Sequence, residues 1–108
     1  MDNTFFFVRQ QEFLKRVNIH EIKYVIADGN ICTLHLIDER TVQLKASLRQ
    51  LLSKLPLGKF LRIHKSCIVN LDYLEKVEVK TREAHLGDTK LPIGKTYYPD
   101  ILELLHLI

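Results

Sequence analysis

The sequence predicts a mainly β fold of short antiparallel strands, with one short helix at about residues 47–55 and a second helix at the C-terminus. Three observations lead to this prediction. Apolar and polar residues alternate over many short stretches, which is the pattern of half-buried strands. Glycine or asparagine separates several of these stretches, as in hairpin turns. The two helical stretches instead repeat apolar residues at i, i+3, i+4 and i+7.

Five stretches of the N-terminal half have the alternation, or the aromatic and β-branched content, of strands: residues 5–9, 13–17, 22–27, 31–37 and 41–45. Gln10-Gln11-Glu12 and Asp28-Gly29-Asn30 are polar turn sequences, so the first four stretches are predicted to form two hairpins. Between these hairpins, Asn18 and Glu21 have the spacing of a capping box around a single helical turn.

The short helix is predicted from its cap and its apolar repeat. Ser47 and Gln50 have capping-box spacing, and Pro56 and Gly58 follow as terminators. The repeat consists of Leu48, Leu51, Leu52 and Leu55. At the C-terminus, Pro99 suits the first helical position. It precedes the same repeat, made of Ile101, Leu104, Leu105 and Ile108.

The stretch from Phe60 to Asn70 interrupts a strand pattern with polar residues. Phe60, Arg62 and His64 alternate with Leu61 and Ile63, as expected for a half-buried strand, and Ile68-Val69 resumes the apolar character. Between them, His64-Lys65-Ser66 places three hydrogen-bonding side chains in a row. Beyond this stretch, three short antiparallel strands are predicted, at residues 74–81 with Val77 and Val79 alternating, 84–86 and 89–93.

Size and composition fit a single globular domain over residues 1–108. The chain is 46% apolar and 27% charged, and its length allows a hydrophobic core without disulfides or metals. No apolar run is long enough to span a membrane, and Met1 to Thr4 lack the basic start of a secretory signal. We therefore expect a cytoplasmic protein with no membrane partner.

The chain lacks the residue spacings of an enzyme or a metal site. Its five histidines are scattered, and no HExxH, GxSxG or phosphate-binding glycine loop is present. Cys32 and Cys67 lack CxxC spacing, so buried free thiols are the simpler interpretation, although Cys67 lies near His64 in sequence. We expect no catalytic residues, metal, cofactor or small-molecule substrate.

A binding surface fits better. Lys45, Lys65 and Lys95 lie at breaks between predicted elements, each near a hydroxyl residue: Ser47, Ser66 and Thr96. Lysine neutralises phosphate charge and hydroxyl groups donate to phosphate oxygens, so together these residues suit a nucleic acid. Taken singly, each lysine is better explained as a solvated strand end, and only the three together favour a binding surface. The net charge of +3 permits a polyanionic partner without requiring one.

The stretch FLRIHKSCIVNL, residues 60–71, resembles the F-x-R-x-H-[RK]-S-x-[IV]-V-N signature of the LytTR DNA-binding domain, the output module of many bacterial two-component response regulators. Supporting matches cover almost the whole chain: residues 22–25 before the Gly29-Asn30 turn, Ser47-Leu48, and residues 91–97. The resemblance implies an elongated sandwich of small antiparallel sheets. It also implies transcription regulation, in which loops between strands enter the major groove of promoter DNA at repeated sites, and an N-terminal receiver domain in the full-length protein.

Family position also implies a role for individual residues. Asn30 with Ile31, Lys65, and Lys95 with Thr96 correspond to the segments that touch bases, whereas His64, Ser66, Arg62 and Lys45 correspond to supporting or backbone-contacting positions. Ile31 replaces a frequent aromatic residue and cannot hydrogen-bond to a base, which favours Asn30. Gly94 replaces a frequent serine, and its backbone N–H is expected to approach a phosphate instead. Asn70 is assigned mainly to capping the turn after the strand.

A second hypothesis is a protein-interaction module that docks a receiver or membrane sensor domain without reading DNA. The two hypotheses differ in what they require of Lys45, Lys65 and Lys95. If the three lysines lie along one edge of the fold, DNA binding is favoured. If they scatter, docking is favoured.

Overall fold

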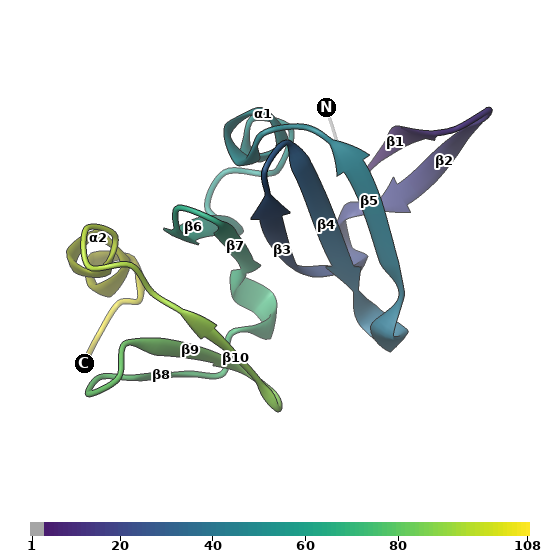
Figure 1. Cartoon of the computed structure of the whole chain (residues 1–108). Coiled ribbons are helices and arrows are strands. Elements are labelled where there is room, and N and C mark those ends of the chain that lie inside the picture. Colours follow the sequence, from purple (N-terminus) through teal and green to yellow (C-terminus); the bar gives the residue numbers. More distant parts are fainter. Residues whose placement is uncertain (1–3) are drawn as a thin grey trace.

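In residues 4–108, the part of the chain that the computed structural model describes, ten strands form three antiparallel sheets (Figure 1). Met1 to Asn3 lie outside the described residues. The predicted domain and the segment considered for a secretory signal both begin with these three residues. The molecule measures 46 × 31 × 25 Å along its principal axes. The mainly β fold and the elongated arrangement of small sheets are thereby confirmed.

The largest sheet has the strand order β5-β4-β3-β7-β6, and smaller sheets flank it. Its strands are β3 (Ile22–Asp28), β4 (Ile31–Leu36), β5 (Thr41–Lys45), β6 (Phe60–His64) and β7 (Cys67–Asn70). A two-stranded sheet pairs β1 (Phe5–Gln10) with β2 (Phe13–Asn18). A three-stranded sheet of order β10-β9-β8 contains β8 (Lys76–Glu78), β9 (Glu83–Leu86) and β10 (Thr89–Pro92).

Two α-helices and three single-turn 3-10 helices complete the described part of the chain. They are α1 (Leu48–Leu52), α2 (Tyr98–Leu104), η1 (Ile19–Glu21), η2 (Ile37–Glu39) and η3 (Leu71–Tyr73). No helix among residues 4–108 is long and apolar enough to cross a membrane.

The β6–β7 hairpin lies between two hydrophobic cores. Ile68 belongs to the core shared with α1 and the β1–β2 hairpin, whereas Cys67 and Val69 belong to the core shared with β8–β10 and α2. Each of these three residues has a relative exposure of 0%. Phe60 likewise points into the first core and Ile63 into the second. Phe60 and Ile63 therefore lie on opposite faces of the strand, as predicted. The prediction of a half-buried strand is wrong, because other elements of the fold cover both faces.

Helix α1 forms with the predicted capping box but ends earlier than predicted. The Ser47 hydroxyl oxygen accepts from the Gln50 backbone N–H at 3.0 Å, and the Gln50 side chain accepts from the Ser47 N–H at 3.0 Å. After Leu52 the chain tightens, and the Leu55 N–H donates to the Leu52 carbonyl three residues back. This tighter turn brings Leu55 into the first core, although it lies outside the helix.

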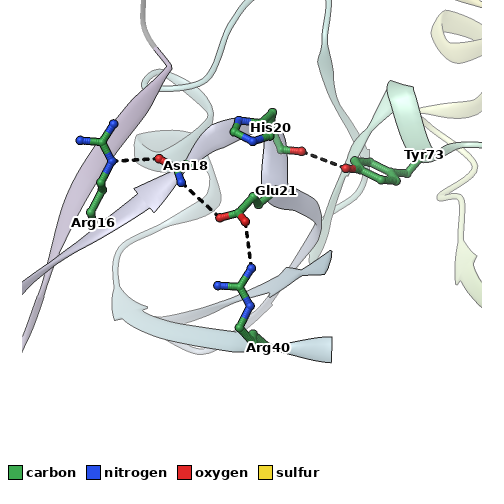
Figure 2. A network of polar contacts seen from close by, with 6 residues as sticks. All are labelled: Arg16, Asn18, His20, Glu21, Arg40 and Tyr73. Carbon is green, nitrogen blue, oxygen red and sulfur yellow. Dashed lines mark hydrogen bonds and ion pairs between the residues drawn. The ribbon is translucent and has the colours of Figure 1, made fainter. Parts of the chain in front are cut away.

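The predicted capping box at Asn18 and Glu21 does not form, because arginines take both side chains (Figure 2). Asn18 Oδ1 accepts from Arg16 Nε at 2.9 Å, and Asn18 Nδ2 donates to Glu21 Oε1 at 3.4 Å. Glu21 Oε2 pairs with Arg40 Nη2 at 2.9 Å, and this hydrogen bond lowers the pKa of the Glu21 carboxyl. The Tyr73 hydroxyl donates to the His20 carbonyl at 3.0 Å, so contacts connect η1 to β2, to Arg40 just before β5, and to η3.

The C-terminal elements form with two differences from the prediction. The strand expected over residues 74–81 is reduced to β8, and Val79 is 73% exposed in the following turn. The predicted C-terminal helix begins at Tyr98 and ends at Leu104, so it spans only about two turns. One face of the helix packs on the second core through Ile101 and Leu105. Leu104 and Ile108, which the repeat placed on that face, are exposed instead.

Asn70 is the polar residue on which the end of β7 depends. It is 1% exposed, and it caps the following turn as predicted by accepting from the Asp72 N–H at 3.0 Å. Its Nδ2 also donates to the Ile22 carbonyl in β3 at 2.9 Å.

We expect Asn70→Ala to lower the free energy of unfolding by about 2 kcal/mol, because it leaves a buried carbonyl and an N–H unpaired. Urea unfolding measures the change. Asn30→Ala, at an exposed turn, is the matched control and should stay within about 0.5 kcal/mol of the parent. Equal stability of the two variants would contradict this role of Asn70.

Candidate nucleic-acid interface

The β6–β7 turn presents Lys65 at its tip, and its neighbours hold the turn in shape. Arg62 Nη2 donates to the Lys65 carbonyl at 2.6 Å, and Arg62 Nε donates to the His64 carbonyl at 3.3 Å. The Arg62 side chain therefore spans the turn from β6. Lys65 is exposed, whereas Arg62 and His64 are half-buried. The guanidinium thus fixes the backbone from which the Lys65 side chain extends.

His64 and Ser66 lock the other side of the turn. The Ser66 backbone N–H donates to His64 Nδ1 at 3.2 Å, and the Ser66 hydroxyl lies 2.9 Å from the same nitrogen. Because a backbone N–H can only donate, Nδ1 acts as the acceptor and the ring proton lies on Nε2. No group among residues 4–108 hydrogen-bonds to this Nε2. His64 therefore retains one N–H that can donate to an external acceptor.

Backbone hydrogen bonds bring three other segments to the same end of the large sheet. The Ala46 N–H donates to the Asn30 carbonyl at 3.2 Å, so the end of β5 lies beside the β3–β4 turn (Figure 1). The Ala27 N–H donates to the Ser66 carbonyl at 2.9 Å, which places the β6–β7 turn beside the end of β3. The Gly94 N–H donates to the Ile63 carbonyl at 2.8 Å and adds the segment after β10.

We call this end of the sheet the reading edge and define it by the four segments that meet there. In spatial order they carry Lys45; Asn30 and Ile31; Lys65 and Ser66; and Lys95 and Thr96. Ile31 is half-buried and pairs with Lys45, whereas Asn30, Lys45, Lys65, Lys95 and Thr96 are exposed. The eight side chains expected at the site thus lie on these segments or, like Arg62 and His64, directly beneath them.

Within the described part of the chain, the three lysines of the reading edge form no ion pairs. Among residues 4–108, the two lysine and arginine salt bridges are Arg40–Glu21 and Lys59–Asp72, and both lie elsewhere. Lys45, Lys65 and Lys95 therefore keep their charges available to an external anion. The three lysines thus lie along one edge of the fold, which is the arrangement expected for DNA binding rather than for docking.

Gly94 has a different role from the expected one. Its N–H is already used by the Ile63 carbonyl, so the expectation that it approaches a phosphate is wrong. The glycine allows close packing, because a Cβ there would lie 3.1 Å from Tyr97 Cδ2, a tight contact, and 3.6 Å from His64 Cδ2. Tyr97, to which sequence reasoning gave no separate role, thus packs beside His64 and Arg62 at the base of the edge.

Cys67 and His64 do not form a nucleophile and base pair. Cys67 is fully buried, and its Sγ faces the Ile68 carbonyl at 3.9 Å. Burial raises the pKa of the Cys67 thiol to about 12, so the thiolate is scarce at neutral pH. Cys32 is also buried, and its thiol donates to the Ala46 carbonyl at 3.0 Å. The interpretation of both cysteines as buried free thiols is confirmed.

Comparison with known proteins agrees with the geometry. The family model described as the LytTr DNA-binding domain matches residues 13–106. The sensory transduction protein LytT of Bacillus anthracis is 28% identical over 102 residues, which cover 90% of this chain and 41% of that protein. An uncharacterized response regulatory protein of Vibrio cholerae is 28% identical over 93 residues, covering 78% of this chain and 34% of that protein.

Among solved structures, a LytTr DNA-binding domain from Bacillus cereus superposes with a TM-score of 0.83 and 20% identity. The match covers 96% of this chain and 98% of that one. At this identity the likeness concerns the fold, and it extends across all three sheets. The chain spans well under half the length of the two relatives described above.

The state of the cysteines gives a direct chemical prediction. At pH 8, a thiol with a pKa near 12 is ionised in about one molecule in ten thousand. We expect neither cysteine of the native protein to react with Ellman's reagent within minutes, and both to react at once in guanidinium chloride. Rapid reaction of one equivalent in the native protein would contradict the burial of these thiols.

Proposed function

Because the chain belongs to the LytTR DNA-binding domain family, we propose that it binds double-stranded DNA sequence-specifically through the reading edge. The observation that carries the proposal is the alignment of four segments by three backbone hydrogen bonds, with exposed unpaired lysines on three of them. A row of cations without carboxylate partners suits a polyphosphate backbone.

The reading edge has the dimensions of a groove-binding surface. Five spacings of about 4.8 Å separate β5 from the segment at Gly94, so the edge is about 24 Å long before side chains are counted. One turn of the DNA duplex measures about 34 Å. Long lysine side chains at both ends extend the reach further. This length supports the proposal that the loops insert into the major groove and follow it for most of a turn.

Base contacts come from the exposed residues at the tips. Lys65 donates to guanine O6 and N7, and the Asn30 amide both donates to and accepts from an adenine edge. Lys95 and Thr96 contact bases or phosphates from the adjoining segment. His64 offers its Nε2–H, and Lys45 its charge, to the DNA backbone, whereas Arg62 and Ser66 hold the Lys65 turn.

The setting of this activity is transcription regulation in a two-component system. The names of the relatives, sensory transduction protein LytT and response regulatory protein, support an effector role in a response regulator. Since the chain spans only 41% of the Bacillus anthracis protein, an N-terminal receiver domain belongs to the proposal. Repeated promoter sites, bound by paired effector domains, are the proposed target.

A docking function is favoured by a different surface. Phe7, Phe13 and Leu14 of the β1–β2 hairpin are 53%, 69% and 68% exposed. They border a groove of about 1050 Å³ against β5, in which Arg9, Lys15 and Lys45 contribute positive charge, and its described lining includes no carboxylate. An acidic, partly apolar face of a receiver or sensor domain would complement this groove. Lys45 and Ile31 of the reading edge also line this groove, so a partner docked there would cover that end of the edge and leave the segments of Lys65 and Lys95 free.

Lys65→Ala should weaken binding to the preferred duplex by about 1–3 kcal/mol, which is roughly 5- to 150-fold, because it removes one side chain that contacts a base or phosphate. Gel-shift or fluorescence-anisotropy titration measures the change. Lys59→Ala, an exposed lysine that precedes the opposite end of β6, is the control and should bind normally. Unchanged affinity of Lys65→Ala would remove Lys65 from the interface and favour docking.

Salt dependence separates the two kinds of contact that Lys65 can make. Affinity should fall steeply with salt, because each neutralised phosphate releases counterions. If Lys65 contacts a phosphate, the Lys65→Ala variant should have a logarithmic salt slope shallower by about 1. If it contacts a base, the slope should stay the same. A flat salt profile of the parent protein would contradict DNA binding through these lysines.

A further inference from the structure

Three potential metal ligands meet on one face of the β8–β9 hairpin, away from the segments of the reading edge. Glu78 and Glu83 are directly paired across the two strands, and His85 follows Glu83 by two residues, so all three side chains leave the same face. One ligand atom from each residue lies within 4.8 Å of the other two. Strand pairing creates this cluster, and no sequence spacing indicates it.

His85 gives an independent sign that a partner is missing. The residue is 8% exposed, and its Nε2 is a buried polar atom without a hydrogen-bond partner among residues 4–108. Buried polar side chains are normally paired, and an unpaired one is costly. Glu78 Oε1 lies 3.5 Å from His85 Nε2, beyond the usual hydrogen-bond length. His85 thus lies beside two carboxylates while its Nε2 makes no hydrogen bond to residues 4–108.

We propose that Glu78, Glu83 and His85 bind a divalent transition-metal ion, with zinc as the best match. Zinc takes imidazole nitrogen and carboxylate oxygen at about 2.0–2.2 Å. Two such ligand atoms on a tetrahedral ion lie about 3.3–3.5 Å apart, which is the separation already present between His85 and Glu78. The other pairs of ligand atoms lie at most 4.8 Å apart, and rotation of the glutamate side chains can shorten these distances to the same value. Three protein ligands leave a fourth position for water.

The ion would also relieve an unfavourable contact between like charges. Carboxylates placed directly opposite in an antiparallel pair repel, and the Thr81 hydroxyl, which lies 3.0 Å from Glu83 Oε1, is the one side-chain donor that these two carboxylates have among residues 4–108. A proton on His85 is the competing occupant, because an imidazolium would pair with Glu78. Lys76 and Lys90 are the cross-strand neighbours of His85, and both are exposed. Their charges therefore distinguish little between a metal ion and a proton at this position.

Metal binding at this hairpin would reach the reading edge through the backbone. Glu83 pairs with Pro92 at the end of β10, and the Ile93 N–H donates to the Arg82 carbonyl at 2.9 Å. The next residue, Gly94, starts the segment that carries Lys95. Fixing Glu78 to Glu83 therefore stiffens the strand pair from which that segment departs.

The test uses tag-free protein stripped with EDTA and titrated with zinc chloride against a chromogenic chelator of known affinity. We expect one zinc ion per chain and a rise in Tm that EDTA reverses. His85→Gln and Glu78→Gln should each bind at least tenfold more weakly. His20→Gln, which removes an exposed histidine elsewhere, should bind like the parent. Calcium and magnesium should not compete, because imidazole favours transition metals.

Circular dichroism in EDTA shows whether each variant is folded, and Glu78→Gln serves if His85→Gln is not. Zinc affinity of the parent no greater than that of the folded variants would overturn the proposal in favour of a protonated His85. Equal competition by calcium would overturn it as well, since the site would then be a carboxylate pair alone. DNA binding does not enter this readout, so the result stands apart from the proposed function.

Discussion

Strand β7 is buried on both faces, and the rest of the molecule is arranged around this constraint. Its side chains alternate between two cores, with Ile68 in one and Cys67 and Val69 in the other. Sheets and helices on both sides must therefore pack against one hairpin. Because β7 is held from both sides, the turn that precedes it is held as well. The exposed Lys65 thus extends from a turn that is held by hydrogen bonds and joined to a buried strand.

The signature stretch divides into many supporting residues and one exposed residue. Phe60 fills a core, Arg62 binds the carbonyls of the turn, and Asn70 ties β7 to β3. Within residues 60–71, Lys65 alone is exposed, and it lies at the tip of the turn. Supporting residues of this kind reduce the conformational entropy that a flexible loop would lose on binding. A substitution at the tip should therefore change what the turn contacts without changing the fold.

Local sequence signals predicted the elements well, because hairpin turns and caps depend on neighbouring residues. The Gly29-Asn30 turn and the Ser47–Gln50 capping box are examples. Predictions failed where a distant residue competed. Arg40 takes Glu21 from its expected cap, and the Ile63 carbonyl takes the Gly94 N–H. The cluster of Glu78, Glu83 and His85 depends on strand register, which one sequence does not specify in advance. The residue roles at the reading edge came from family resemblance, whereas their alignment comes from the three-dimensional pairing of strands.

The most direct test of the account is an NMR titration of the 15N-labelled domain with a duplex selected by the protein from random-sequence DNA. The account predicts that the amide resonances of residues 29–31, 64–66 and 94–97 shift together at one stoichiometric ratio. Amides of η2 and η3, at the opposite end of the large sheet, should not move. Shifts confined to the β1–β2 hairpin, or to the η2 and η3 end, would contradict the assignment of DNA binding to the reading edge.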